Sequence, residues 1–202
     1  MNGRIDTLIE RIRHLEEELE VELAKRREEL RVQLVGRRVR FSPEVLRQHR
    51  ELKTGLIAYI ADIRPVMLLT LPFIYVLAVP LVLLDMLATL YQAVCFPIYG
   101  IPKVGRHHHL IFDRHHLGYL NIIEKFNCWY CSYANGLIAY VREIAARTEQ
   151  YWCPIKHAHR IAGAHARYGH FLDYGDAEAY HRRFEDVRCD FGDRHPDPPP
   201  ED

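Results

Sequence analysis

The stretch that decides the fold is Val66–Pro102, VMLLTLPFIYVLAVPLVLLDMLATLYQAVCFPIYGIP, in which Asp85 is the only charged residue. About 20 apolar residues already span a bilayer as a helix, so this stretch is longer than a buried core helix needs. As one straight helix it would measure about 55 Å at 1.5 Å per residue, against about 30 Å of hydrocarbon. The stretch therefore predicts a membrane-embedded helical segment over residues 65–103.

Three prolines, Pro72, Pro80 and Pro97, indicate breaks in the helical hydrogen bonding of this segment. Two arrangements fit. In one, a single span near Val66–Leu84 precedes a helix that lies in the membrane interface. In the other, which we favour, two short helices form a hairpin that bends near Pro80–Asp85. Asp85 is then either a functional intramembrane carboxylate or a residue at headgroup level.

The N-terminal flank, residues 1–36, has the spacing of a coiled-coil helix. Apolar side chains at alternating steps of three and four residues are Ile5, Leu8, Ile12, Leu15 and Leu19. The stripe then slips in phase and resumes at Leu23, Leu30 and Leu34, which is a stutter. Because so narrow a stripe on so long a helix needs a partner, we expect residues 5–34 to form parallel homo-oligomers. The alternative is a solvated helix that packs on its own chain.

Residues 42–64 predict a basic amphipathic helix directly before the apolar segment. Ser42 suits the N-cap position and Pro43 the first helical position. The polar side carries four cations, Arg47, Arg50, Lys53 and Arg64. Such a helix is expected to lie against anionic lipid headgroups.

Residues 105–191 predict a small helical domain rich in Cys and His. We expect helices over 116–127, over Leu137–Gln150 after a break at Asn135-Gly136, from Cys153-Pro154 onward, and over Ala177–Val187. No stretch alternates strictly as a surface strand does, so the fold class predicted is all-α. The tail, 192–202, is proline-rich and acidic, and we expect it to be disordered.

The motifs Cys128-Trp-Tyr-Cys131 and Cys153-Pro-Ile-Lys-His157 supply the strongest chemical signal in this domain. Three thiolates and an imidazole in two short pairs form a familiar tetrahedral zinc shell, and an iron–sulfur cluster or iron could use the same groups. We therefore predict a metal centre at Cys128, Cys131, Cys153 and His157, with zinc as the expected ion. The alternative is that the cysteines are small buried apolar residues.

A geometric objection leaves a second ligand set open. If the chain turns at Asn135-Gly136, the next helix is about 21 Å long and carries Cys153 and His157 away from the CxxC pair. They would then approach His115 and His116, which form the alternative site with Cys153 and His157. One centre with all four first-choice ligands requires a bend in that helix or ligands from two subunits.

Histidines and carboxylates in the same domain raise an enzymatic alternative. Ten of the 13 His lie between His107 and His181, and Glu124, Glu143 and Glu149 lie on the expected helices, where one could orient a ligand imidazole. A metal-dependent oxidoreductase at the membrane surface could use such a cluster. However, the spacing does not match paired His boxes, and there is one E-x2-H where bundle di-iron sites use two. A dithiol role for the CxxC pair is disfavoured because no βαβ pattern surrounds it.

Charge and cysteine usage bound the partners and the compartment. Lys+Arg and Asp+Glu both number 27, which disfavours nucleic-acid binding. Four cations precede the apolar segment and three follow it, so the N-terminal side is expected in the cytoplasm. Thiols at ligand spacing favour a reducing compartment for the C-terminal domain as well. We expect a membrane of the bacterial inner-membrane type with both end domains cytoplasmic.

The sequence thus predicts a membrane-anchored metal-binding helical protein, a structural or redox component of a larger membrane assembly. Two alternatives stay open, a metal-dependent oxidoreductase at the membrane surface and a non-catalytic coiled-coil membrane scaffold. The sequence names neither a reaction nor a substrate.

Overall fold

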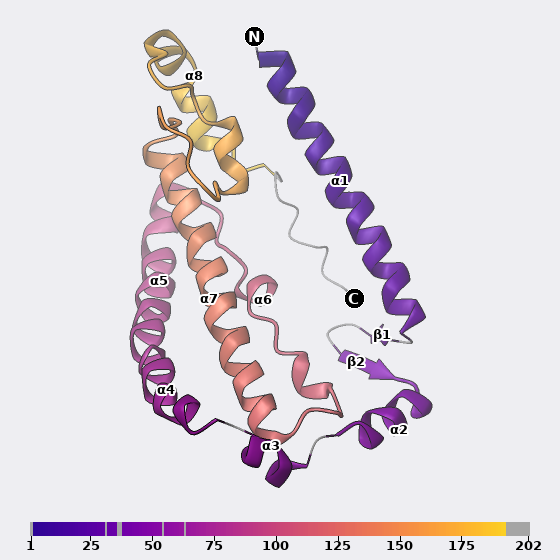
Figure 1. Ribbon diagram of the computed structural model, residues 1–202. Helices are drawn as coiled ribbons and strands as arrows, with labels where there is room; N and C mark the ends of the chain where they lie inside the picture. Colours follow the sequence, from indigo (N-terminus) through magenta and orange to yellow (C-terminus); the bar gives the residue numbers. More distant parts are fainter. Residues whose placement is uncertain (1, 31, 36–37, 54, 63, 193–202) are drawn as a thin grey trace. The chain divides into compact units, whose positions relative to one another are not determined.

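The computed structural model describes residues 2–30, 32–35, 38–53, 55–62 and 64–192, and these are mostly helical, as predicted. The elements in chain order are α1 (Asn2–Glu29), β1 (Val32–Val35), β2 (Arg38–Phe41), α2 (Pro43–Glu51), α3 (Leu56–Asp62), α4 (Pro65–Val76), α5 (Ala78–Tyr99), α6 (Arg106–His109), the 3-10 helix η1 (Arg114–His116), α7 (Ile122–Trp152), the 3-10 helix η2 (Ala166–His170) and α8 (Ala177–Cys189) (Figure 1). The described residues divide into two compact units, one from Asn2 to Leu56 with Asp113–Lys125, and the other Ile57–Phe112 with residues 126–192.

In the first unit, the predicted N-terminal helix forms, but it ends before the last residues of the apolar stripe seen in the sequence, Leu30 and Leu34. α1 stops at Glu29, and β1 and β2 form an antiparallel hairpin that pairs Val32 with Phe41. The expectation of no strand was therefore wrong. The overlooked signal is Arg38-Val39-Arg40-Phe41, which alternates polar and apolar residues with the period of a strand.

The helix predicted over residues 42–64 forms as two shorter helices. Its start is confirmed, because the Ser42 hydroxyl accepts a hydrogen bond from the Val45 N–H at 3.4 Å and Pro43 is the first helical residue. α2 ends at Glu51, and α3 begins only at Leu56, after Gly55. Glycine destabilises a helix interior, so Gly55 itself accounts for the interruption between α2 and α3.

In the second unit, α4 and α5 form one nearly continuous apolar rod, Pro65–Tyr99. Leu77, at the joint, keeps a right-handed helical backbone, and its carbonyl accepts the Leu81 N–H at 3.2 Å. The bend expected near Pro80–Asp85 is therefore wrong. Pro80 lies in the first turn of α5. Backbone N–H groups in the first turn of a helix make no intrahelical hydrogen bond, so a proline, which has no N–H, fits there without a break. By length and composition, the rod is the single described helix that could cross a membrane.

α7 is an unbroken helix of 31 residues, so the break predicted at Asn135-Gly136 was wrong. Its start is a capping box: the Asn121 side chain accepts the Glu124 N–H at 3.0 Å, and the Glu124 carboxylate accepts the Asn121 N–H at 2.8 Å. Gly136 is buried in the middle of the helix. A Cβ there would lie 2.6 Å from the His109 carbonyl oxygen, so this glycine serves close packing and not a turn.

The rod and α7 lie side by side and run in the same direction (Figure 1). Near the start of both, the Tyr75 hydroxyl donates to Asn127 at 2.6 Å; near their ends, the Tyr99 and Tyr151 rings stack 5.2 Å apart. Two parallel helices need a connection that travels back along them. The first part of this connection, Gly100–Phe112, is called the return segment below. Its residues Ile101 and Val104 complete a core with Ala88, Phe96, Leu137, Tyr140 and Ile144.

After α7 the chain contains less helix than predicted. Residues from Cys153 to Asp176 form no α-helix, and the helix expected from Cys153-Pro154 was wrong. Instead, Leu172 donates its N–H to the Pro154 carbonyl at 2.8 Å, and its carbonyl accepts the Lys156 N–H at 2.7 Å. The final predicted helix is confirmed as α8. The tail expected to be disordered falls on residues 193–202, outside the described residues, and on Gly192.

Candidate functional site

The rod has one polar face, and this face is turned toward α7. Asp85, Thr89 and Gln92 follow one another at steps of four and three residues, which places them on one side of α5. Asp85 and Gln92 are buried, and Thr89 is half-buried. Polar side chains in an apolar helix are stable only when their hydrogen bonds are satisfied, so their partners define the site.

The Asp85 carboxylate is surrounded by donors. Arg106 of the return segment donates from both terminal guanidinium nitrogens, with Nη2 2.6 Å from Oδ2, and Nη1 bonds Oδ1. The Tyr133 hydroxyl of α7 donates to Oδ2 at 2.9 Å, and Thr89 donates to Oδ1 at 3.4 Å. The hydrogen bond to Asp85 raises the pKa of Arg106 above its already high value. The guanidinium therefore stays charged, and Asp85 with its donors Arg106 and Tyr133 connects α5, the return segment and α7.

Gln92 continues the same face toward the end of the rod. Its Oε1 accepts the Val104 N–H at 2.9 Å, and its Nε2 donates to the Tyr140 hydroxyl. Tyr140 is one of the most deeply buried residues of the described chain. Asp85 and Gln92 of α5 thus hold the return segment at Arg106 and Val104, and Tyr133 and Tyr140 of α7 bond these same two α5 side chains. We call Asp85, Gln92, Arg106, Tyr133 and Tyr140 the polar clamp.

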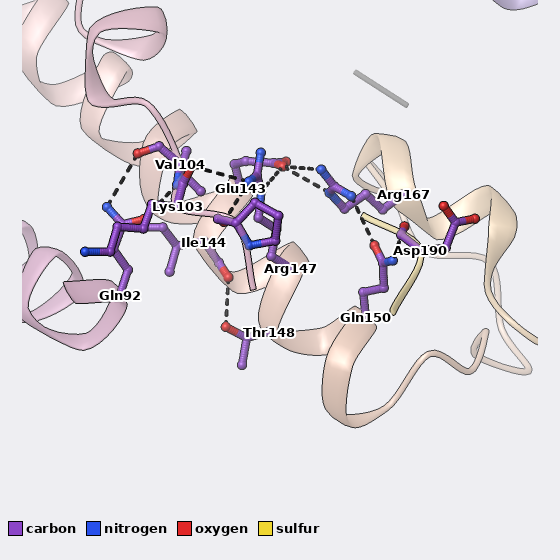
Figure 2. Close-up of polar contacts among 11 residues, drawn as sticks. Gln92, Lys103, Val104, Glu143, Ile144, Arg147, Thr148, Gln150, Arg167 and Asp190 are labelled. Carbon is purple, nitrogen blue, oxygen red and sulfur yellow. Dashed lines mark hydrogen bonds and ion pairs between the residues drawn. The ribbon is translucent and has the colours of Figure 1, made fainter. Parts of the chain in front are cut away.

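A second network lies further along α7 (Figure 2). Glu143 accepts hydrogen bonds from Arg147 Nε at 2.8 Å and from Arg167 Nε at 3.0 Å. Arg147 also donates to the Pro102 carbonyl at 2.8 Å. Although burial raises the pKa of Glu143, the hydrogen bond from Arg147 and the charge of Arg167 outweigh burial and hold this pKa below its usual range.

The same network reaches the C-terminal region. Arg167 donates to Gln150 Oε1 at 3.1 Å, and Gln150 Nε2 donates to the Asp190 carbonyl at 2.6 Å (Figure 2). Gln150 Nε2 also donates to the Val187 carbonyl at 3.0 Å. One half-buried carboxylate and two buried arginines thereby connect the return segment, α7, η2 and the end of α8. The arrangement fixes segments of irregular backbone that hydrophobic packing alone would leave poorly specified.

The four first-choice metal ligands do not meet within one chain. Cys128 and Cys131 lie one turn apart on α7, while Cys153 follows its last residue. Since α7 is unbroken, the helical rise places Cys131 and Cys153 about 33 Å apart. His157 lies beyond Cys153, and its ring stacks on Tyr168 at 6.3 Å. A centre that uses all four residues therefore needs ligands from two subunits, which is one of the arrangements that the sequence left open.

The alternative ligand set is divided between the two units. His115 and His116 belong to the first unit, and Cys153 and His157 to the second. This set stays a prediction. Within the part of the chain that the structure describes, no group of three or more His, Cys, Asp or Glu side chains is placed to hold a metal ion.

The carboxylates expected beside the metal have other partners. Glu124 caps α7, Glu143 binds two arginines, and Glu149 lies 3.0 Å from His165 Nε2. On α8, Glu178 pairs with Arg182 at 3.4 Å, one turn along the helix. These interactions stabilise helices and loops.

Sequence reasoning singled out Asp85 but missed its partners. Arg106 and Tyr133 were assigned no role in a site. One signal was available: Asp85, Thr89 and Gln92 recur at helical spacing, which marks a face of the apolar segment that must contact protein. Nothing in the spacing of Arg106 and Tyr133, 21 and 48 residues from Asp85, names them as its donors.

Comparison with known proteins finds no matching family model, no matching curated protein and no matching solved structure. The function is therefore argued from the chemistry of the rod, the polar clamp and the exposed surfaces.

Proposed function

We propose that the protein is a membrane-anchored helical scaffold, in which the α4–α5 rod binds the lipid bilayer, the polar clamp fixes α7 to the rod, and the network around Glu143 fixes the C-terminal region to α7. The observation that carries the proposal is the outward surface of the rod. Large apolar side chains are exposed along its full length, among them Leu69 at 71%, Phe73 at 75% and Ile98 at 73%. Folded soluble monomers rarely expose a continuous apolar surface of this extent.

The distribution of polar groups supports the same assignment. The polar side chains of α5 that belong to the clamp face protein. By helical spacing, the apolar side chains of Leu83, Leu90 and Val94 lie on the opposite side of the helix. A helix in a purely aqueous protein usually has the reverse order, with polar side chains outward. The outward side of the rod is apolar, and the polar side chains on its inward side have their hydrogen bonds satisfied by protein. This distribution suits contact with lipid.

A flotation experiment tests the proposal. The full chain, added to vesicles of phosphatidylcholine and phosphatidylglycerol, should float with them and resist extraction at high salt. The double substitution Leu69→Asp and Phe73→Asp should abolish flotation, since it places two charges on the lipid-contacting surface. Tyr174→Asp is the matched control, because Tyr174 is 69% exposed in a loop of the same unit. Equal flotation of all three proteins would contradict the proposal.

A second candidate adds a metal centre to this scaffold. Cys128 and Cys131 lie one turn apart on one helix, so each chain offers a pair of thiols, and two chains together could complete a zinc or iron–sulfur site. Cys153 and His157 would join such a site only from another subunit. Metal analysis of the purified oligomer tests it: about one ion per pair of chains is expected, and Cys131→Ser should remove it. A metal-free oligomer would leave the scaffold without this centre.

A further inference from the structure

We infer that the α4–α5 rod lies in the plane of one membrane leaflet and does not cross the bilayer. This inference rests on the proposed membrane anchoring and specifies its geometry. Three features of the second unit support it: the length of the rod, the course of the return segment and the charge along α7.

The rod is too long for an ordinary span. Its 35 residues extend about 52 Å, whereas the hydrocarbon core is about 30 Å thick. A crossing helix of that length would have to tilt by about 55°, beyond the range of about 0–40° found for membrane spans. Exposed apolar side chains nevertheless continue from Val66 near one end to Ile98 near the other. The exposed apolar surface therefore has to be covered by lipid along the whole length of the rod.

The return segment lies on the polar side of the rod, and its structure is incompatible with a hydrocarbon environment on that side. It passes Gln92 at Val104, Asp85 at Arg106 and Gly136 at His109, so it lies beside the middle of the rod. Apart from the single turn of α6, its backbone is irregular. Irregular backbone that faces lipid does not occur within the hydrocarbon region, because its polar groups would lack partners.

The side chains of this segment have the same preference for water. Lys103 and His107 are exposed, and the Arg106 side chain remains 45% exposed although it is paired with Asp85. If the rod crossed the bilayer, Asp85 would lie near the midplane and would bring these cations to that depth. Charged groups at the bilayer centre are costly unless protein or a water-filled cavity surrounds them.

α7 completes the argument because it follows the rod from end to end. Beside the last turns of α5 it carries Arg142, Glu143, Arg147 and Glu149. Charged side chains of α7 therefore lie beside the end of the rod, while residues 126–141, beside its middle, carry no charge. An interfacial rod, whose apolar side enters the membrane by about 5–10 Å, keeps these charged side chains in water. Both flanks of the rod then remain on one side of the membrane, as the hairpin prediction also required.

Depth measurements along the rod distinguish the two geometries. Spin labels are placed singly at outward positions 69, 76, 83, 94 and 98 of the full chain, bound to phosphatidylcholine–phosphatidylglycerol vesicles, and their accessibility to oxygen and to a water-soluble nickel complex is compared. An in-plane rod gives one common depth at all five positions. A depth that rises to a maximum near position 83 and falls toward both ends would overturn the inference.

The unmodified chain provides a second measurement that needs no cysteine replacement. Lys53 precedes the rod and Lys103 follows it. A membrane-impermeant amine reagent, added to sealed membranes that contain the protein, should modify both lysines from the same side, as read by peptide mass spectrometry. Modification of one lysine only, with the second reacting after the membrane is opened, would overturn the inference. Labels that all report water, with no flotation, would instead contradict the membrane anchoring itself.

Discussion

Gly136 of α7 lies so close to the carbonyl oxygen of His109 that a Cβ atom on this residue would approach it to 2.6 Å. The Leu110 Cα would be 3.1 Å away. Both neighbours are backbone atoms of the return segment, which cannot move aside as a flexible side chain can. The absence of a side chain at residue 136 is what lets irregular backbone lie directly on the helix.

Gly136→Ala should therefore destabilise the protein. In an ordinary helix interior this change stabilises by about 0.8–1 kcal/mol, so the sign of the effect is diagnostic. Here the clash with backbone should outweigh that gain and give a net loss of about 1–3 kcal/mol in the free energy of unfolding. Denaturant unfolding in detergent measures it. Asn135→Ala, at the exposed neighbouring position, is the control; a stabilising Gly136→Ala would contradict the close packing described here.

The Asp85–Arg106 pair should show strong coupling between its two residues. Arg106→Gln leaves the buried carboxylate without its charged donor and should cost about 2 kcal/mol. This value is below the 3–5 kcal/mol typical of a fully buried pair, because Arg106 is half exposed. Asp85→Asn combined with Arg106→Gln should recover part of the loss. A double-mutant cycle on unfolding free energies checks this, and strictly additive effects would contradict a direct ion pair.

Glu143 should make the stability of the second unit sensitive to acid. Its pKa in the folded protein is lower than its ordinary value of 4.5, so the unfolded chain binds the proton more readily. The stabilisation is fully present above about pH 4.5 and is lost as the pH falls through the folded-state pKa. Glu143→Gln should flatten this part of the curve of unfolding free energy against pH. Glu178→Gln, on the exposed side of α8, should retain the wild-type curve.

The exposed apolar stripe of α1 should mediate self-association. Leu8, Ile12, Leu15 and Leu19 are each more than half exposed and follow the coiled-coil spacing. Leu8→Asp with Leu15→Asp should reduce the mass of the particle in detergent to that of one chain, as measured by light scattering. Val21→Asp is the control, since Val21 is equally exposed but lies outside the stripe. An unchanged mass in the double variant would contradict self-association through α1.

The parts of the fold that were predictable from the sequence are those with a local cause. The apolar run, the cap at Ser42 and the helix α8 follow from composition, capping chemistry and helical spacing, each within a short stretch. The failures have distant causes. Local sequence indicates a turn at Gly136 because its partner, His109, is 27 residues away, and it indicates a helix start at Pro154 because Leu172, which donates a hydrogen bond to its carbonyl, is also distant in the sequence.

The candidate site divides in the same way. Asp85 stood out as the one charge in an apolar stretch, but the donors that satisfy it come from the return segment and from α7. The cysteine motifs have suitable spacing within each pair, yet the unbroken course of α7 separates the pairs in one chain. Short-range spacing identifies residue types that could cooperate, while the connection between helices decides which of them meet.

The parallel course of the rod and α7 has a consequence for synthesis. Asn127 is 52 residues later in the chain than Tyr75, to which it is bonded. At about 5–20 residues per second, translation therefore takes roughly 3–10 s to deliver α7 after the corresponding part of the rod. During that interval the nascent rod is an apolar helix with an unsatisfied carboxylate and no protein to cover it. Whatever receives it near the ribosome, lipid or a chaperone, binds before the polar clamp can close.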